Sequence, residues 1–331
     1  MRFVVYGAGA VGGVLGGRLA QHGHDVTLIA RGPHLDAIRA GGLRVEDPDD
    51  AVVLRLPCLA SPNDLDLGPD DVVLLAMKTQ DTADALDNLA AAVAPTTPVV
   101  CVQNAVVNET MALRRFVNVY GVAVMLPTQF LEPGVVQAYS TPTTGLLDLG
   151  PVPGGHVDKL ATAIAGAFSE SRLPSVARPD IMAWKYRKLI TNLANAIEAV
   201  CGPDARGGRL GDIVTAEGES CLDAAGIDRV SVEEDRERRG DLMRWRRIGG
   251  ARRGGGSSWQ SLTRATGAIE TDYLNGEIVL LGRRHGVPTP PTPRCNDSPV
   301  RSPTPAGAPD PSPRTMCWRC WQTPDRVHSA N

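Results

Sequence analysis

Apolar residues in the first half of the chain recur with two alternating periods. Short apolar runs that are typical of buried strands lie at residues 2–6, 25–30, 71–78 and 98–103. Two of the intervening segments, 7–23 and 80–94, carry their apolar residues at helical spacing, and the first has small residues on its inner face. Strands that alternate with helices predict an α/β domain with a parallel, doubly wound sheet, the Rossmann architecture.

The pattern changes after Pro179. Two further strand-like runs and a helical stretch precede this point, at 119–126, 144–149 and 155–172. After it the apolar spacing is helical to about residue 285 with no clear strand, and one long helix is expected over 181–202. We therefore expect a Rossmann domain over residues 1–178 and an all-α substrate domain over residues 179–290.

The last helical region is expected to end near Gly286, since cations precede this glycine and a proline follows it. His285 then belongs to a helix end, which explains it without a catalytic role. Residues 291–331 follow neither period, and nine of these 41 residues are proline, so we expect a disordered tail. The C-x-x-C pair Cys317 and Cys320 in the tail has no second pair, and no metal site is expected. Because a coherent domain stops abruptly at this point, we hypothesise that the tail is read out of frame, which the other two frames of the gene would test.

Composition narrows the class of protein. A chain of 331 residues with 43% hydrophobic content is long enough for two domains, each with its own core. A net charge of −3, from 34 basic and 37 acidic residues, gives no broad electrostatic surface for nucleic acid or membrane. No apolar run approaches the roughly 20 residues that a bilayer requires, and the N-terminal run is too short for a signal peptide. Seven cysteines, an odd number, do not indicate a disulfide framework, so we expect a reduced, cytoplasmic protein.

A glycine motif follows the first predicted strand directly. Gly7, Gly9 and Gly12 form a G-x-G-x-x-G that follows a strand, opens a helix and begins a strand–helix–strand unit, which is the context a dinucleotide site requires. Gly7 permits the tight turn, Gly9 the close approach of the pyrophosphate, and Gly12 close packing of helix on strand. The helix N-terminus supplies N–H donors to the phosphates. The alternative is a glycine-rich turn that binds no nucleotide.

The end of the second predicted strand indicates which dinucleotide binds. An NAD site usually places an acidic residue there for the ribose 2′-hydroxyl, whereas this chain has Ala30, Arg31 and Gly32. Arg31 can pair with a 2′-phosphate, and no carboxylate stands there to repel one. The sequence therefore favours NADP as the cofactor.

A polar stripe lies on the helix expected after residue 180. Lys188, Asn192 and Asn195 are spaced i, i+4 and i+7, so they share one face. An amine and two amides suit a carbonyl substrate, because they offer a proton donor and hydrogen-bonding groups. The alternative is an amphipathic helix whose polar face meets water. The chain has only four lysines, and arginine supplies nearly all of its other positive charge. A lysine such as Lys188 therefore either meets a requirement for an amine or is present by chance.

At this point the sequence resembles the ketopantoate reductase (2-dehydropantoate 2-reductase) family. The matching segments are GAGAVG with Arg31, AMKTQ at 76–80, VQN at 102–104, WKYRKLITNLANA at 184–196, and SSWQSL followed by IETDYLNG within 257–276. The later segments are the more specific, since many dehydrogenases share the glycine motif. The resemblance implies NADPH-dependent reduction of the C2 ketone of 2-dehydropantoate to pantoate, a step of pantothenate and CoA biosynthesis.

The resemblance also implies roles for individual residues. Lys188 would be the general acid that protonates the ketone oxygen, and Glu270 would orient its amine or a water. A lysine close to a carboxylate can stay charged in a cleft and stabilise the developing alkoxide. Lys185 competes by proximity alone, because the family segment aligns on Lys188.

The remaining implied roles concern binding. Asn192 and Ser258 would hold the keto acid, while Lys78 and Asn104 would line the cleft for cofactor and substrate. Such folds commonly dimerise through their helical domain, so a homodimer is a candidate assembly.

Two positions depart from the family pattern. Asn104 is followed by Ala105, where the family usually has glycine, so the loop near the nicotinamide is expected to differ. The family's second amide, four residues beyond Asn192, falls on Ala196, and the adjacent Asn195 is expected to substitute. Two alternatives therefore stay open: a related NADP-dependent reductase of another 2-keto acid or an imine, and a sensor that binds NADPH without turnover.

Overall fold

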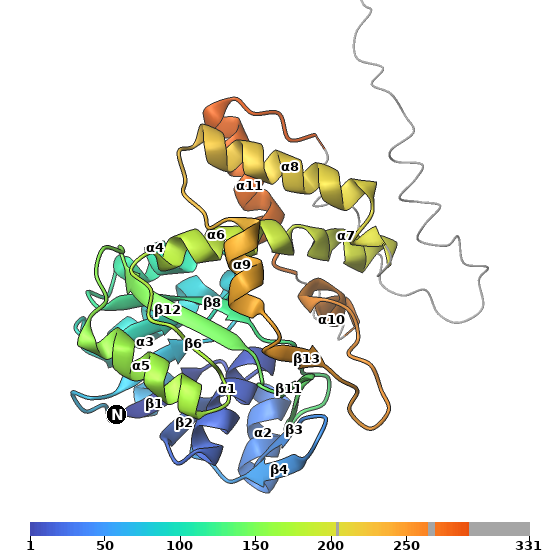
Figure 1. Cartoon of the computed structure of the whole chain (residues 1–331). Coiled ribbons are helices and arrows are strands. Elements are labelled where there is room, and N and C mark those ends of the chain that lie inside the picture. The colour runs from blue at the N-terminus through green and yellow to red at the C-terminus, as the bar shows by residue number, and fades with distance from the viewer. Residues whose placement is uncertain (203–204, 264–268, 291–331) are drawn as a thin grey trace, which may run out of the picture. The chain divides into compact units, whose positions relative to one another are not determined.

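The computed structural model describes residues 1–202, 205–263 and 269–290 (Figure 1). They form two compact units that interleave along the chain: Met1–Ile190 with Ile227–Gly254, and Thr191–Gly226 with the described residues from Gly255 onward. These units do not coincide with the expected boundary at residue 178. The tail, with Cys317 and Cys320, lies outside the described residues.

A seven-stranded sheet lies at the centre of the first unit. Its order is β5-β2-β1-β6-β7-β8-β12. The strands are β1 (Arg2–Tyr6), β2 (Asp25–Ile29), β5 (Cys58–Leu59), β6 (Val72–Leu75), β7 (Val99–Cys101), β8 (Val119–Met125) and β12 (Leu146–Val152). All neighbours pair in parallel except β12, which runs antiparallel to β8. The predicted doubly wound sheet is confirmed, and its order reverses between β1 and β6, the switch point where such folds bind ligands.

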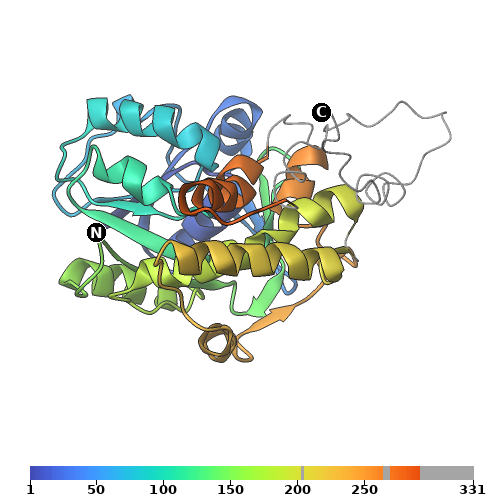
Figure 2. The same ribbon diagram turned by 90° about the horizontal axis from the view of Figure 1, so that it is seen from above.

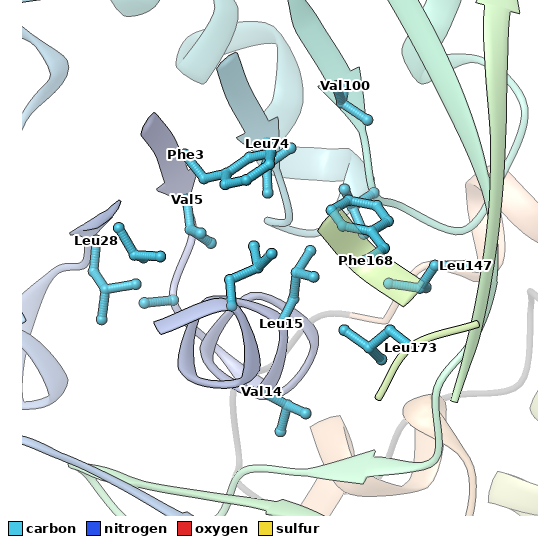
Figure 3. Packing of buried hydrophobic residues seen from close by; sticks show 14 of the residues in the cluster. Phe3, Val5, Val14, Leu15, Leu28, Leu74, Val100, Leu147, Phe168 and Leu173 are labelled. Carbon is cyan, nitrogen blue, oxygen red and sulfur yellow. The ribbon is translucent and has the colours of Figure 1, made fainter. Parts of the chain in front are cut away.

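Alternation along β1 divides the core of this unit into two layers. Phe3 and Val5 point to one face, where α1 (Ala10–Gln21) and α5 (Lys159–Glu170) cover the sheet (Figure 3). Val4 points to the other face, which α3 (Thr82–Ala92) and α4 (Asn108–Leu113) cover. Figure 2 shows α3 and α5 on opposite sides of the sheet. Both faces are buried, which explains why the strands read as continuous apolar runs.

Two smaller sheets complete the first unit. One has the order β4-β3-β10-β9, and the other pairs β11 with β13. Their strands are β3 (Leu43–Glu46), β4 (Ala51–Leu54), β9 (Thr128–Gln129), β10 (Val135–Ala138), β11 (Ser140–Pro142) and β13 (Met243–Trp245). Helix α2 (Gly32–Gly41) follows β2.

The prediction that no strand follows residue 179 was wrong, because β13 pairs with β11 from Ser140↔Trp245 to Pro142↔Met243. A strand of three residues is too short to show a period of its own. Helix α9 (Val232–Arg239) is held in the same unit by Arg238, which donates to the Asp148 carboxylate of β12 at 2.6 Å. These contacts explain why residues 227–254 return to the first unit.

The second unit is helical. Its helices are α7 (Ala194–Cys201), α8 (Arg209–Ala224), α10 (Ser257–Thr263) and α11 (Thr271–His285). Helix α11 ends as predicted, with Gly286 in the left-handed region at φ 71°. None of the described helices has the length and apolarity to cross a bilayer.

The helix expected over 181–202 is interrupted. It consists of α6 (Ile181–Asn192) and α7, with Leu193 between them. The carbonyl of Leu193 accepts a hydrogen bond from Nδ2 of the buried Asn275 on α11, at 3.1 Å. Leu193 itself keeps helical dihedrals (φ −56°, ψ −35°), so the interruption is slight, and the hydrogen bond from Asn275 lies at this point.

Candidate active site

The glycine motif has the geometry that a dinucleotide turn requires. Gly7 has φ 101°, and a Cβ placed on it would lie 2.7 Å from the backbone N of Met77 at the end of β6. A Cβ on Gly12 would lie 2.2 Å from the carbonyl oxygen of Gly7 and 3.0 Å from Val5 on β1. Any side chain at either position would push the turn away from the sheet. Gly7 and Gly12 therefore serve backbone packing, as the motif predicts.

Gly9 differs from its two partners. Apart from Gly9 itself and its two chain neighbours, no described residue comes within 4 Å of the position that a Cβ would take there. Gly9 is also the N-cap of α1, and its carbonyl accepts the Gly13 N–H at 2.7 Å. The space beside it lies at the N-terminus of a helix that carries no acidic residue in its first turn. This arrangement fits the pyrophosphate of a dinucleotide.

Arg31 stands at the end of β2, where the adenosine ribose is expected. Its side chain is 83% exposed, and Nη2 pairs with Oδ2 of Asp81 at 3.2 Å. A single exposed ion pair of this kind is weak, so a 2′-phosphate can compete with Asp81 for the guanidinium. The position of Arg31 fits NADPH.

His34 links the glycine turn to the segment around Gly134 by two hydrogen bonds. The Gly134 N–H donates to Nδ1 of His34 at 2.8 Å, so Nε2 carries the proton and donates to the Ala8 carbonyl at 2.7 Å. Burial lowers the pKa of His34 below its ordinary value of 6.5. A neutral His34 therefore holds the turn that contains Gly7 and Gly9.

A buried polar network joins the loops after β6 and β7. Gln103 donates from Nε2 to the Met77 carbonyl at 2.9 Å and to the Thr82 hydroxyl at 2.7 Å. Thr82 donates to Oδ1 of Asn108 at 2.9 Å, and Nδ2 of Asn108 donates to the Asn104 carbonyl at 2.8 Å. The AMKTQ and VQN segments are thus held together by hydrogen bonds, which fixes the loops that carry the predicted Lys78 and Asn104.

Ala105 lies in this second loop with φ 66°, in the left-handed region. Glycine adopts that conformation without penalty, whereas alanine is strained by about 1–2 kcal/mol. The departure noted in the sequence therefore places a strained residue in this loop, and its buried methyl group adds bulk beside Asn104.

Lys185 is an anchor at the centre of the unit. Its Nζ pairs with Glu109 of α4 at 2.8 Å and donates to the carbonyls of Gln103 at 2.8 Å and Val122 at 3.2 Å. The side chains of the pair are only 2% and 1% exposed. An ammonium that is committed in this way is unavailable to a substrate, so Lys185 is not the proton donor. Instead it ties α6 to the loop that contains Asn104.

Lys188 lies one turn further along α6 and is partly buried. The first unit therefore joins the glycine turn, the loops with Lys78 and Asn104, and the helix segment with Lys188.

The other predicted residues belong to the second unit, where Asn192, Asn195, Ser258 and Glu270 are all buried. Glu270 is the N-cap of α11. Assembly of Glu270 with Lys188 stays a prediction.

Comparison with known proteins gives the family. Residues 3–154 match the ketopantoate reductase PanE/ApbA family, and residues 180–293 match its C-terminal domain. The 2-dehydropantoate 2-reductase of Mesorhizobium japonicum is 30% identical over 319 residues, which cover 88% of this chain and 94% of that protein. This chain belongs to the ketopantoate reductase family. The 2-dehydropantoate 2-reductase of Pyrococcus horikoshii is 31% identical over 201 residues, and the match spans only 64% of its length.

Solved structures of family members have the same fold. A PanE/ApbA family ketopantoate reductase from Ralstonia eutropha JMP134 superposes with a TM-score of 0.74 at 28% identity, covering 89% of this chain and 96% of that one. The fold also extends to D-mandelate dehydrogenase in complex with NADH and anilino(oxo)acetate, at a TM-score of 0.75 and 23% identity over 90% of this chain and 96% of that one.

Sequence reasoning missed the residues that support the site rather than form it. Glu109, Gln103, Thr82 and Asn108 are polar and buried, yet each stands in a segment whose apolar pattern gave no sign of a partner. Lys185 carried a signal, since it is one of four lysines and lies three residues before Lys188. Only the fold shows that its partner, 76 positions earlier, is Glu109.

Proposed function

We propose that this ketopantoate reductase family member reduces 2-dehydropantoate to pantoate with NADPH. The observation that carries the proposal is the connection of three parts within one unit. The Lys185 ammonium links α6, which bears Lys188, to the Gln103 carbonyl beside Asn104, and the network of Gln103 links that loop to the end of β6.

NADPH, when bound, supplies a hydride to C2 of the keto acid. For the cofactor we propose Gly7, Gly9 and Gly12 at the pyrophosphate and Arg31 at the 2′-phosphate, with Lys78 and Asn104 lining its inner end. The open space at Gly9 and the exposed side chain of Arg31 support this assignment.

Lys188 donates the proton in the proposed reaction. As the hydride adds to C2, the carbonyl π electrons move to the ketone oxygen, and Nζ of Lys188 transfers a proton to it. The products are pantoate, NADP⁺ and a neutral amine that solvent reprotonates. A cation at this position stabilises the developing alkoxide, and Glu270 keeps the amine charged and oriented. Asn192, Asn195 and Ser258 hold the keto acid by hydrogen bonds.

A second candidate is the same reduction of a different 2-keto acid. It is favoured by Ala196, which is buried where the family has its second amide, so no amide stands at that position. Loss of a hydrogen-bonding group in a pocket can change selectivity strongly, because polar groups of the substrate are then left unpaired.

The substrate is tested by following NADPH oxidation with a panel of 2-keto acids that includes 2-dehydropantoate. The proposal expects the highest kcat/KM with 2-dehydropantoate. A higher value with another acid would select the second candidate, and NADPH binding without any turnover would indicate a sensor.

We also propose that the enzyme works in the cytoplasm and forms a homodimer. All four cysteines in the described part of the chain are buried and unlinked, which fits a reducing compartment. Light scattering at micromolar concentration checks the assembly, and a monomeric mass would refute the dimer.

A further inference from the structure

A charged pair in the second unit contacts one of the residues proposed to bind substrate. Nη1 of Arg206 donates to Oδ1 of Asn195 at 2.6 Å and to Oε2 of Glu198 at 2.7 Å. Asn195 and Glu198 are buried, at 6% and 7% exposure, whereas the Arg206 side chain is 39% exposed. The guanidinium therefore reaches from the partly exposed loop before α8 onto the buried face of α7.

This contact fixes the orientation of the Asn195 amide. A guanidinium has donors only, so the atom that faces it must be the amide oxygen. The Nδ2 hydrogens then point away from Arg206, so on that side Asn195 presents donors. Because Glu198 neutralises Arg206, the guanidinium is committed to this role and is a poor anchor for the substrate's carboxylate.

Glu198 has a second contact on the segment that leads to Ser258. Its Oε1 accepts the backbone N–H of Gly256 at 2.8 Å. A Cβ on the neighbouring Gly255 would lie 2.8 Å from the same oxygen and 2.9 Å from Cβ of Trp259. The glycines thus let the chain pass directly against the carboxylate, two residues before Ser258.

We propose that Arg206, held by Glu198, is a positioning residue that turns the Asn195 amide into a dedicated donor for an oxygen atom of the keto acid. This donor takes the place of the family's second amide, which is Ala196 here. The inference rests on the proposed reduction of a 2-keto acid. It adds the direction of one hydrogen bond, in which Asn195 donates and an oxygen of the substrate accepts.

Asn195→Asp separates this role from a structural one. An aspartate keeps the shape and the contact with Arg206 but places a second buried carboxylate beside Glu198, so thermal unfolding is measured alongside to show that the variant is folded under assay conditions. It has no N–H donor and repels an anionic acid, so the KM for 2-dehydropantoate is expected to rise by at least about thirtyfold. If Asn195→Asp retains the wild-type KM, the proposal is wrong.

A double-mutant cycle tests whether Arg206 acts through Asn195. Arg206→Met and Asn195→Ala are each expected to raise the KM for 2-dehydropantoate about tenfold, with kcat and the KM for NADPH within about threefold of wild type. The double variant is expected to be no worse than either single one, because both remove the same oriented donor. Arg206→Lys is expected to recover part of the loss, and Arg209→Met, at an exposed position on α8, is the matched control.

The outcomes distinguish this inference from the function on which it rests. If the wild type reduces 2-dehydropantoate but the two losses in KM add, Arg206 has only a structural role and the inference fails alone. If another keto acid is the better substrate, the cycle is run on that acid with the same expectations. If the wild type reduces no keto acid, the proposed function fails and this inference fails with it.

Discussion

Ala105 holds a left-handed backbone conformation at φ 66° in the loop beside Asn104. The strain predicts how substitutions behave. Ala105→Gly relieves it but loses a buried methyl group and adds entropy to the unfolded chain, so the free energy of unfolding is expected to stay within about 1 kcal/mol of wild type. Ala105→Val, with a β-branched side chain at a buried position, is expected to lower it by at least about 2 kcal/mol. Urea unfolding measures both, and a valine variant as stable as wild type would show that the loop is unstrained.

Arg31 carries the prediction about the cofactor. Arg31→Ala removes the charge-assisted contact to a 2′-phosphate, so the KM for NADPH is expected to rise by about ten- to a hundredfold. NADH has no such phosphate, and its kcat/KM is expected to change less than twofold. Steady-state kinetics with both cofactors checks this, with the exposed Arg55→Ala as control. Equal losses with NADPH and NADH would remove Arg31 from the phosphate site.

His34 gives a prediction about pH. Its pKa in the folded protein is lowered by burial, so the unfolded chain binds more protons between the folded value and about 6.5. The stability contributed by His34 is therefore complete above pH 6.5 and is lost as the pH falls through the folded pKa. Protonation of Nδ1 would also remove the acceptor for the Gly134 N–H.

The measurement compares the pH dependence of unfolding for wild type and His34→Gln. Other groups titrate equally in both proteins, so the difference between the two curves isolates His34. The wild type is expected to lose more stability than the variant below pH 6.5. Parallel curves would contradict the assignment.

At the scale of elements, the Lys185–Glu109 pair joins α6 to α4 and to the loop after β7. Lys185→Met leaves a buried carboxylate without its cation and is expected to destabilise the protein by about 3–5 kcal/mol. Adding Glu109→Gln removes the uncompensated charge and is expected to recover part of this loss. Thermal and urea unfolding measure the effect, and the exposed Lys159→Met is the control. If Lys185→Met and Lys159→Met have the same free energy of unfolding, the Lys185–Glu109 pair does not stabilise the fold.

Helices and strands long enough to show a regular spacing of apolar residues could be predicted from the sequence. The first two strands were predicted to within one residue. The glycine motif located the turn and helix α1, because its spacing between a strand and a helix can be read within a few consecutive residues. β13 and the break at Leu193 were not predictable. Each lies at a contact with a partner far away in sequence, β11 for the strand and Asn275 for the break.

In the candidate site, too, local motifs were predictable and contacts between distant segments were not. The residues assigned to cofactor and substrate followed from motifs and from the resemblance, whereas their supports followed only from the fold. Arg206 and Glu198 illustrate this, because Glu198 lies on α7 and Arg206 eight residues later in the loop before α8, and neither stands in a recognisable motif. Ala105 is an intermediate case, since the sequence flagged the position and φ supplied the reason.

At the scale of the whole molecule, the two units contribute different parts of the proposed reaction. The first contains the nucleotide turn, the supporting networks and Lys188, and the second contains Asn195, Ser258 and Glu270. The chain passes between the units within α6, only a few residues after Lys188. Family membership spans both, with matches at residues 3–154 and 180–293.

The central claim is that Lys188 protonates the ketone in an NADPH-dependent reduction of 2-dehydropantoate. The direct measurement is kcat for NADPH oxidation with that acid, for the wild type, Lys188→Ala and the control Lys159→Ala. Loss of a general acid is expected to lower kcat by about 10²–10⁴-fold in Lys188→Ala while NADPH still binds, and Lys159→Ala is expected to match the wild type. A Lys188→Ala variant that retains the wild-type kcat would contradict the account.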